Sequence, residues 1–99
     1  MNSPSTNRSA EIWRHMEEAV AELLADRGEE PGALTDATRI NADLGISSVD
    51  AIHLLVMLED RVGSPLDFQE LAVRDGEYVP DLSLGEIRAF ICRTLGVAL

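Results

Sequence analysis

The sequence predicts an all-α domain: three main antiparallel helices and a short helix before the last one, packed as a bundle. Three segments carry apolar residues at helical spacing, over about residues 9–27, 48–62 and 83–95, and each begins near a serine that can cap a helix. The apolar fraction of 45% supports a compact core rather than disorder. With four aromatic residues, that core must consist mainly of Leu, Ile, Val, Ala and Met.

The first helix is expected from Ser9 to about Arg27, after a flexible tail of residues 1–8. Ser9 can act as its N-cap, and Gly28 at the other end breaks the helical pattern. Apolar residues at helical spacing define its predicted buried face, with Trp13 at the border: Ile12, Met16, Ala19, Val20, Leu23 and Leu24.

A long connection follows, in which Leu34 and Ile40 are expected to enter the core. The second helix is expected from about Ser48 to Val62, with Ser47 as its N-cap. Its buried face is assigned to Val49, Ile52, Leu55, Val56 and Val62, and the apolar surface is widened by Leu54, Met57 and Leu58.

The last third of the chain begins with less regular patterns. Residues 68–73 predict a short helix, Asp75–Gly76 marks a turn, and a proline makes 78–81 look extended. Ser83 then caps the last helix, with Glu86 at the capping-box position. The inward residues of this helix are expected to be Leu84, Ile87, Phe90, Ile91 and Leu95.

The net charge of −10 narrows the classes of partner. An acidic chain without lysine repels nucleic acid and anionic membranes and attracts partners with basic surfaces. No apolar run approaches the length of a membrane span, and the polar first residues lack a signal-peptide core. Cys92 is the single cysteine, which excludes an internal disulfide and predicts a buried small hydrophobe. We expect a free-standing monomer in a reduced, cytoplasmic setting.

The most informative segment is Asp43-Leu44-Gly45-Ile46-Ser47-Ser48-Val49-Asp50, a short loop that turns into a helix. A helix start presents unpaired backbone N–H groups and the positive end of the macrodipole, so it suits a phosphate. Gly45 permits a tight turn, and the small Ser47 and Ser48 leave room for a bulky group. These residues alone indicate a serine placed to carry a phosphodiester.

Residues 44–50 resemble the attachment motif of acyl carrier proteins and related peptidyl carrier domains. Residues 50–60 and 83–91 are similar to the second and last helices of that family, so we expect a carrier domain over residues 9–97. By this resemblance, a phosphopantetheinyl transferase joins 4′-phosphopantetheine to Ser48, the serine three residues after the motif's glycine. The arm then carries biosynthetic intermediates as thioesters.

The resemblance also implies docking of the second helix on basic patches of partner enzymes, such as acyltransferases or ligases, ketosynthases and other synthase components. Two residues depart from the family: Ser47 stands where an aspartate is usual, and His53 stands where a glutamate is common. The implied docking residues are Asp43, Ser47, Val49, Asp50, His53, Glu59 and Asp60.

Other chemistry finds little support in the sequence. Asp75, Glu77 and Asp81 lack the spacing of a helix-loop-helix calcium site, and no zinc or nucleotide motif is present. No nucleophile–base–acid set accompanies Ser48, so we expect no catalytic residue and no metal site. The protein is expected to carry rather than to catalyse.

Alternatives stay open at this stage. Ser47 competes with Ser48 as the attachment site, although it is better explained as the helix cap. The departures at Ser47 and His53 and the longer late segment favour polyketide or hybrid secondary metabolism over a fatty-acid or peptidyl (aminoacyl) carrier. Residues 71–81 are either a tolerated surface insertion or part of a pocket mouth or partner contact. An unmodified acidic helical docking module is the alternative from a different class.

Overall fold

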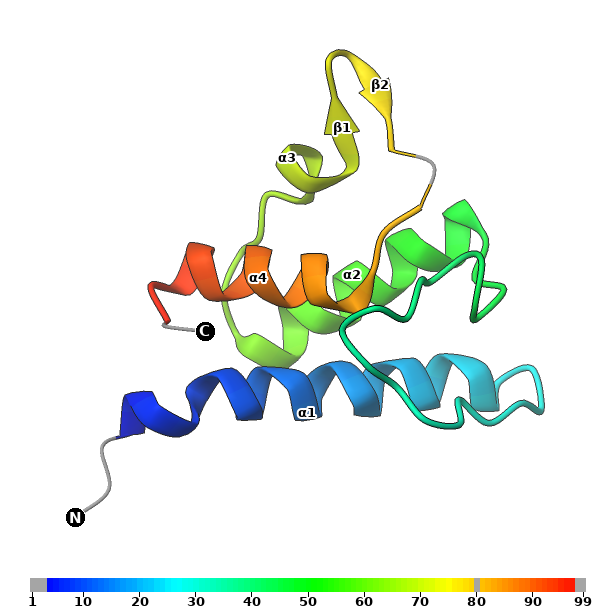
Figure 1. Cartoon of the computed structure of the whole chain (residues 1–99), viewed down its shortest axis with the longest axis horizontal. Helices are drawn as coiled ribbons and strands as arrows, with labels where there is room; N and C mark the ends of the chain where they lie inside the picture. The colour runs from blue at the N-terminus through cyan, green and yellow to red at the C-terminus, as the bar shows by residue number, and fades with distance from the viewer. Residues whose placement is uncertain (1–3, 80, 98–99) are drawn as a thin grey trace.

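The computed structural model describes residues 4–79 and 81–97 and contains four helices. They are α1 (Pro4–Ala25), α2 (Ser48–Val62), α3 (Phe68–Ala72) and α4 (Leu84–Leu95). Helix α1 lies along one side of the molecule and packs against both α2 and α4 (Figure 1). The predicted bundle of three main helices, with a short one before the last, is confirmed.

Helix α1 differs from its prediction at both ends. It begins at Pro4, so Ser9 lies inside the helix and is not its N-cap. Proline suits a first helical turn because its missing N–H would have no partner there. Residues 1–3 of the expected tail lie outside the described residues, whereas residues 4–8 are helical. The helix ends at Ala25, two residues before the predicted end, and hydrogen-bonded turns continue the chain to Gly28.

The core is built from apolar side chains of the three long helices and of the segments between them. The predicted inner face of α1 is buried, as are Ile40 and Cys92, and Leu34 is partly buried. The core residues are Ile12, Met16, Ala19, Val20, Leu23, Leu24, Ile40, Ile46, Leu54, Leu55, Leu58, Leu66, Leu71, Leu82, Leu84, Ile87, Phe90, Ile91, Cys92 and Val97.

The buried face predicted for α2 is wrong at three positions. Val49, Ile52 and Val56 are 76%, 63% and 54% exposed, respectively. They share one side of the helix because they are three and four residues apart. Leu55 is buried as predicted and Val62 is partly buried, and the other residues that α2 buries are Leu54 and Leu58. An exposed apolar row of Val49, Ile52 and Val56, hereafter the α2 stripe, therefore begins directly after Ser48.

The starts of α2 and α4 match the capping signals in the sequence. Helix α2 runs from Ser48 to Val62 as predicted, and the Ser47 hydroxyl caps it. At α4, Ser83 Oγ accepts a hydrogen bond of 3.1 Å from Glu86 N, and Glu86 Oε1 accepts one of 2.9 Å from Ser83 N. The predicted capping box of α4 is confirmed.

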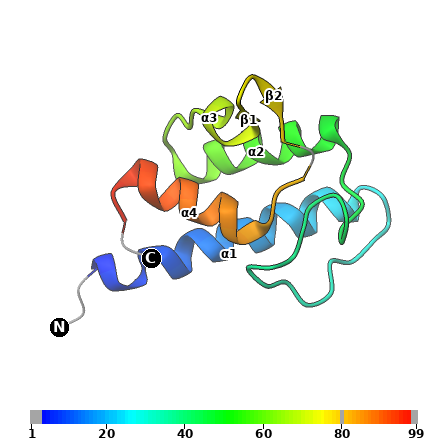
Figure 2. The same ribbon diagram turned by 45° about the horizontal axis from the view of Figure 1, so that its top comes forward.

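A small antiparallel hairpin, which the sequence did not predict, lies between α3 and α4. Its strands are β1 (Val73–Arg74) and β2 (Glu77–Tyr78). The predicted turn at Asp75–Gly76 joins them, with φ of 53° and 78°, the pattern of a two-residue hairpin turn. The hairpin lies on the side of the bundle away from α1 (Figures 1 and 2).

Candidate functional site

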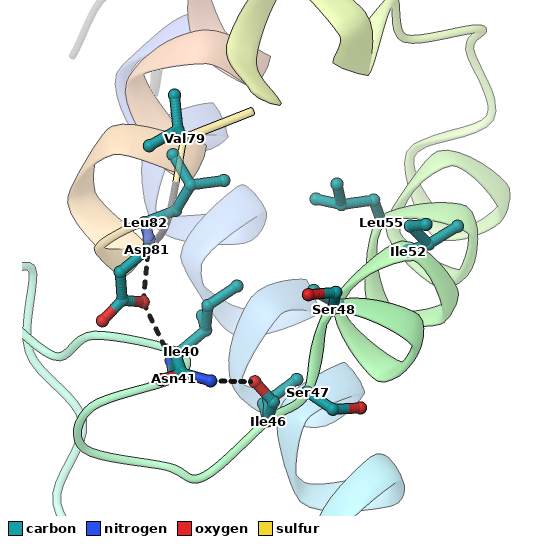
Figure 3. Close-up of a pocket in the computed structure, with 11 residues that line it drawn as sticks. Ile40, Asn41, Ile46, Ser47, Ser48, Ile52, Leu55, Val79, Asp81 and Leu82 are labelled. Atoms are coloured by element: carbon teal, nitrogen blue, oxygen red, sulfur yellow. Dashed lines mark hydrogen bonds between the residues drawn. The ribbon is translucent and has the colours of Figure 1, made fainter. Parts of the chain in front are cut away.

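A pocket of about 320 Å³ opens beside the start of α2. Three parts of the chain form it: the loop before α2, the first two turns of α2, and the segment after the hairpin (Figure 3). Its lining residues are Ile40, Asn41, Ile46, Ser47, Ser48, Ala51, Ile52, Leu55, Val79, Asp81 and Leu82.

The two adjacent serines point in different directions. The Ser48 hydroxyl is directed into the space between Ile40 and Leu55, whereas the Ser47 hydroxyl points away from it (Figure 3). Ser47 Oγ accepts a hydrogen bond of 3.3 Å from Asp50 N, as an N-cap residue does. Ser48 is exposed, and within the described residues its hydroxyl makes no hydrogen bond. Ser48 is therefore the serine that can be substituted without loss of the helix cap.

The start of α2 is electrostatically suited to an anion. Helix α2 has 15 residues, and Ser48 is the first of them. The backbone N–H groups of a first helical turn have no partners within the helix, and the macrodipole places its positive end there. The Ser47 hydroxyl already accepts from one of these groups, the N–H of Asp50. A phosphate oxygen next to Ser48 would meet the remaining ones.

Arg27 fixes the end of the loop that precedes the two serines. Its guanidinium, just beyond α1, donates hydrogen bonds of 3.1 Å to the Gly45 carbonyl and 3.2 Å to the Leu44 carbonyl. Gly45 has φ of 66°, a conformation that glycine adopts without steric cost. The sequence prediction that Gly45 permits a tight turn is confirmed, and Arg27 is a supporting residue that the sequence did not reveal.

Two side chains within the loop add further hydrogen bonds. Asp43 Oδ2 accepts one of 2.7 Å from Arg39 N, and Asn41 Nδ2 donates one of 3.0 Å to the Ile46 carbonyl. Because Ile46 is buried and directly precedes the serines, these bonds give the chain a defined approach to α2.

Asp81 connects this loop to the segment after the hairpin. Its carboxylate accepts hydrogen bonds from the backbone N–H groups of Asn41, Ala42 and Leu82, at 2.9, 3.0 and 2.9 Å. Burial acts to raise the pKa of Asp81, but these hydrogen bonds and the charge of Arg39 outweigh it and hold the pKa below its ordinary value of 3.8. The sequence excluded a calcium site at Asp81 and otherwise placed this residue only within segment 71–81, as a surface insertion or as part of a pocket mouth or partner contact.

The residues expected to dock on partners do not form one acidic surface. Asp43, Ser47, Val49, His53 and Asp60 are exposed. On the exposed side of α2, the α2 stripe lies along the same face as His53 and Asp60, at helical spacing.

Two other docking candidates on α2, Asp50 and Glu59, are half-buried. Glu59 Oε2 accepts a hydrogen bond of 2.7 Å from Leu66 N, so this carboxylate holds the connection between α2 and α3. Its internal bond makes Glu59 less accessible to a partner than the sequence suggested.

Residues 4–79 and 81–97 contain no cluster of three or more His, Cys, Asp or Glu side chains that could hold a metal ion. Within the same residues, no helix combines the length and apolar character needed to cross a membrane.

A small helical bundle with an exposed serine at a helix start, beside a pocket, is a fold that can present a covalently attached group. The family model described as "Phosphopantetheine attachment site" matches residues 17–74, more than half of the 99 residues. The chain therefore belongs to this family, and the resemblance stated from its sequence is confirmed. Neither the comparison with curated proteins nor the comparison with solved structures gives a match.

Membership defines the cofactor and the general role. The family is defined by covalently attached 4′-phosphopantetheine, and the protein is a carrier that tethers intermediates on this arm. Carrier domains of this kind are generally not catalytic themselves and work with phosphopantetheinyl transferases and synthase enzymes.

Proposed function

We propose that this carrier protein bears its 4′-phosphopantetheine arm on Ser48. The observation that carries the proposal is the exposed Ser48 hydroxyl, without a hydrogen bond in the described structure, at the first residue of α2. Ser48 also lies inside the matched residues 17–74. The neighbouring hydroxyl of Ser47 is engaged as the helix cap, which makes it the poorer candidate.

The surroundings of Ser48 fit the group. The helix N-terminus favours the negative charge of a phosphodiester, and the pocket leaves space on the side toward which the hydroxyl points. Apolar walls from Ile40, Leu55 and Leu82 suit the less polar part of an arm or its cargo. When attached, the arm supplies a terminal thiol that carries acyl or aminoacyl groups as thioesters. The chain's own residues hold and orient the arm.

The reactions on the cargo belong, in this proposal, to separate enzymes. No residue of the chain is assigned a catalytic role, because Ser48 serves as a point of attachment. The protein acts in the cytoplasm as a monomer. A phosphopantetheinyl transferase modifies it first, and it then interacts with acyltransferases or ligases, ketosynthases and other synthase components.

The proposed docking surface is the exposed side of α2 with the loop before it. Three large apolar residues exposed in a row beside the attachment point, the α2 stripe, are typical of a protein contact. His53 and Asp60 lie on the same face, and Asp43, Ser47 and Asp50 lie near its start. This arrangement suits a partner surface with an apolar centre and a basic rim.

We assign the cargo to polyketide or hybrid secondary metabolism rather than to fatty-acid synthesis. Support comes from Ser47 and His53, which depart from the usual residues of fatty-acid carriers, and from the hairpin segment before α4. A fatty-acid carrier and a peptidyl or aminoacyl carrier are the alternatives within the class.

Intact-protein mass tests the attachment. The wild type, Ser48→Ala and Ser47→Ala are incubated with coenzyme A, magnesium and a broad-specificity phosphopantetheinyl transferase. We expect one phosphopantetheine increment on the wild type and on Ser47→Ala, and none on Ser48→Ala. An increment that persists in Ser48→Ala contradicts the assignment. No increment on any folded form favours an unmodified helical docking module.

A further inference from the structure

One carboxylate ties two distant parts of the chain together next to the attachment serine. Asp81 lies 40 and 39 residues from Asn41 and Ala42, yet it accepts both of their backbone N–H groups, at 2.9 and 3.0 Å. It also accepts from Leu82 N at 2.9 Å. Asp81 and Asn41 both line the pocket that contains Ser48 (Figure 3). The segment after the hairpin is thereby anchored to the loop before α2.

The anchor continues through a closed set of hydrogen bonds to the residue before the two serines. Asn41 Nδ2 donates to the Ile46 carbonyl at 3.0 Å. Ile46 N donates to the Ile40 carbonyl at 2.8 Å, and Ile40 N donates to the Leu82 carbonyl at 2.9 Å. Asp81, Asn41, Ile46, Ile40 and Leu82 therefore form a ring, hereafter the Asp81 ring, in which both isoleucines are buried. Leu82 is buried as well, and buried side chains at three points leave this ring little freedom to shift.

We propose that Asp81 is a positioning residue for the attachment serine: through the Asp81 ring, it fixes where the Ser48 hydroxyl points relative to the pocket and to an incoming transferase. The inference rests on the proposed function of Ser48. The same segment also supplies Val79 and Leu82 to the pocket wall, so one anchor sets both the wall and the serine.

The role requires a carboxylate. Its two oxygens are acceptors only, and together they meet three N–H groups. An asparagine at this position has nearly the same shape, but its NH₂ group would face a backbone N–H of the loop. The amide keeps one acceptor oxygen where the carboxylate has two, so Asp81→Asn loses at least one of the hydrogen bonds to the loop and weakens the anchor with a small change in volume.

The test compares Asp81→Asn with Asp75→Asn, a matched control. Asp75 is exposed at the hairpin turn, and no hydrogen bond of its carboxylate is found in the described structure. Asparagine also tolerates its positive φ of 53°. Backbone amide NMR spectra are recorded on the unmodified proteins, and steady-state kinetics of a phosphopantetheinyl transferase are measured with each as substrate.

We expect the amide resonances of Asn41 and Ala42 to move in Asp81→Asn, and those of Ile46 and Ser48 to move with them, while the core resonances of α4 stay in place. The kcat of the transferase should fall by roughly tenfold with little change in KM, because the reacting hydroxyl is misplaced but the exposed side of α2 is intact. The control should match the wild type in both measurements.

Unchanged resonances of Ile46 and Ser48 together with an unchanged kcat would overturn the inference, because Asp81 would then anchor only its own segment. If Asp81→Asn does not fold, Asn41→Ala is the second variant. It cuts the ring at the bond to Ile46 and leaves the backbone N–H for Asp81. Ser48 resonances and a kcat that match the wild type in Asn41→Ala would equally refute the proposed role of the Asp81 ring in positioning Ser48. The spectra are independent of attachment, so they separate failure of this inference from failure of Ser48 as the attachment site.

Discussion

At the scale of single residues, the site depends on a division of roles between two adjacent serines. Ser47 has an extended backbone, with φ of −71° and ψ of 169°, whereas Ser48 is the first residue of α2, so their side chains leave the chain in different directions. Ser47 therefore directs its hydroxyl back to the helix backbone, and Ser48 directs its own toward the pocket. One serine of the pair thus caps α2, and the other is the proposed point of attachment.

This division predicts different stabilities for the two alanine variants. Ser47→Ala should lower the free energy of unfolding by about 1 kcal/mol, because the cap of α2 is lost. Ser48→Ala should change it by less than about 0.5 kcal/mol, because an exposed residue outside the cap is replaced. Urea denaturation of the unmodified proteins measures both. A larger loss in Ser48→Ala than in Ser47→Ala would contradict the assignment of the cap.

The Asp81 carboxylate predicts a dependence of stability on pH. Its pKa in the folded protein is lower than the ordinary 3.8, so the folded state binds fewer protons than the unfolded state at acidic pH. The contribution of this carboxylate to the free energy of unfolding is fully present above its pKa in the unfolded chain. It is lost as the pH falls through its lower pKa in the folded protein. Lowering the pH should therefore destabilise the wild type by the amount that the charged carboxylate contributes. Asp81→Asn lacks this contribution at every pH.

The measurement is urea denaturation of the wild type, Asp81→Asn and the control Asp75→Asn, from neutral pH to below pH 3.8. The difference in the free energy of unfolding between the wild type and Asp81→Asn should narrow as pH falls. The difference between the wild type and the control should stay small at neutral pH. A constant gap for Asp81→Asn at every pH would show that the carboxylate charge contributes nothing.

At the scale of elements, α2 is apolar on two sides. One side packs into the core through Leu54, Leu55 and Leu58, and the other carries the α2 stripe. With so many apolar residues in one helix, more than one face satisfies the helical period, so periodicity could not select the buried one. Contact with α1 decides which side of α2 faces the core, and the local sequence of α2 does not predict that contact.

A matched pair of alanine substitutions tests this orientation of α2. Leu58→Ala should cost about 2–5 kcal/mol of stability, because it leaves a cavity in the core. Val56→Ala, on the exposed side, should change stability by no more than about 0.5 kcal/mol. Thermal or urea denaturation of the two variants provides the comparison. Equal losses of stability in the two variants would mean that α2 turns a different side to the core.

The elements differ in how far the sequence could predict them. Local signals predicted the start of α2 at Ser48, the capping box at Ser83 and the turn at Asp75–Gly76, because caps and turns involve residues close in the chain. The extension of α1 to Pro4 was missed because Ser9 offered a cap at which a helix could begin. Strands of two residues are too short to show a period. The bonds of Asp81 link residues about 40 apart, and no local pattern reports them.

At the scale of the whole molecule, charge and apolar surface serve different steps of the partner contact that we propose. The net charge of −10 accelerates the approach of basic partners over a distance. The α2 stripe offers an apolar centre for the contact once it has formed. Ser48 lies at the end of this stripe, so a docked enzyme would meet the arm near its base.

This view predicts different effects of salt for two substitutions on the same face of α2. Ile52→Ala should raise the KM of a transferase for the carrier about tenfold at any salt concentration, because an apolar contact is lost. Asp60→Asn should raise KM at low salt and have little effect at high salt, because exposed charges are screened. Kinetics at two ionic strengths distinguish the cases. No effect of Ile52→Ala would place the docking surface elsewhere.

The most direct test of the central claim is the position of the arm on the wild-type chain. Trypsin cuts after Arg39 and Arg61 and releases residues 40–61, in which Ser47 and Ser48 are the only hydroxyl side chains. Fragmentation of this peptide, taken from protein loaded with phosphopantetheine, separates the two positions. The account predicts the whole increment on Ser48. An increment on Ser47, or a loaded protein whose 40–61 peptide is unmodified, would contradict it.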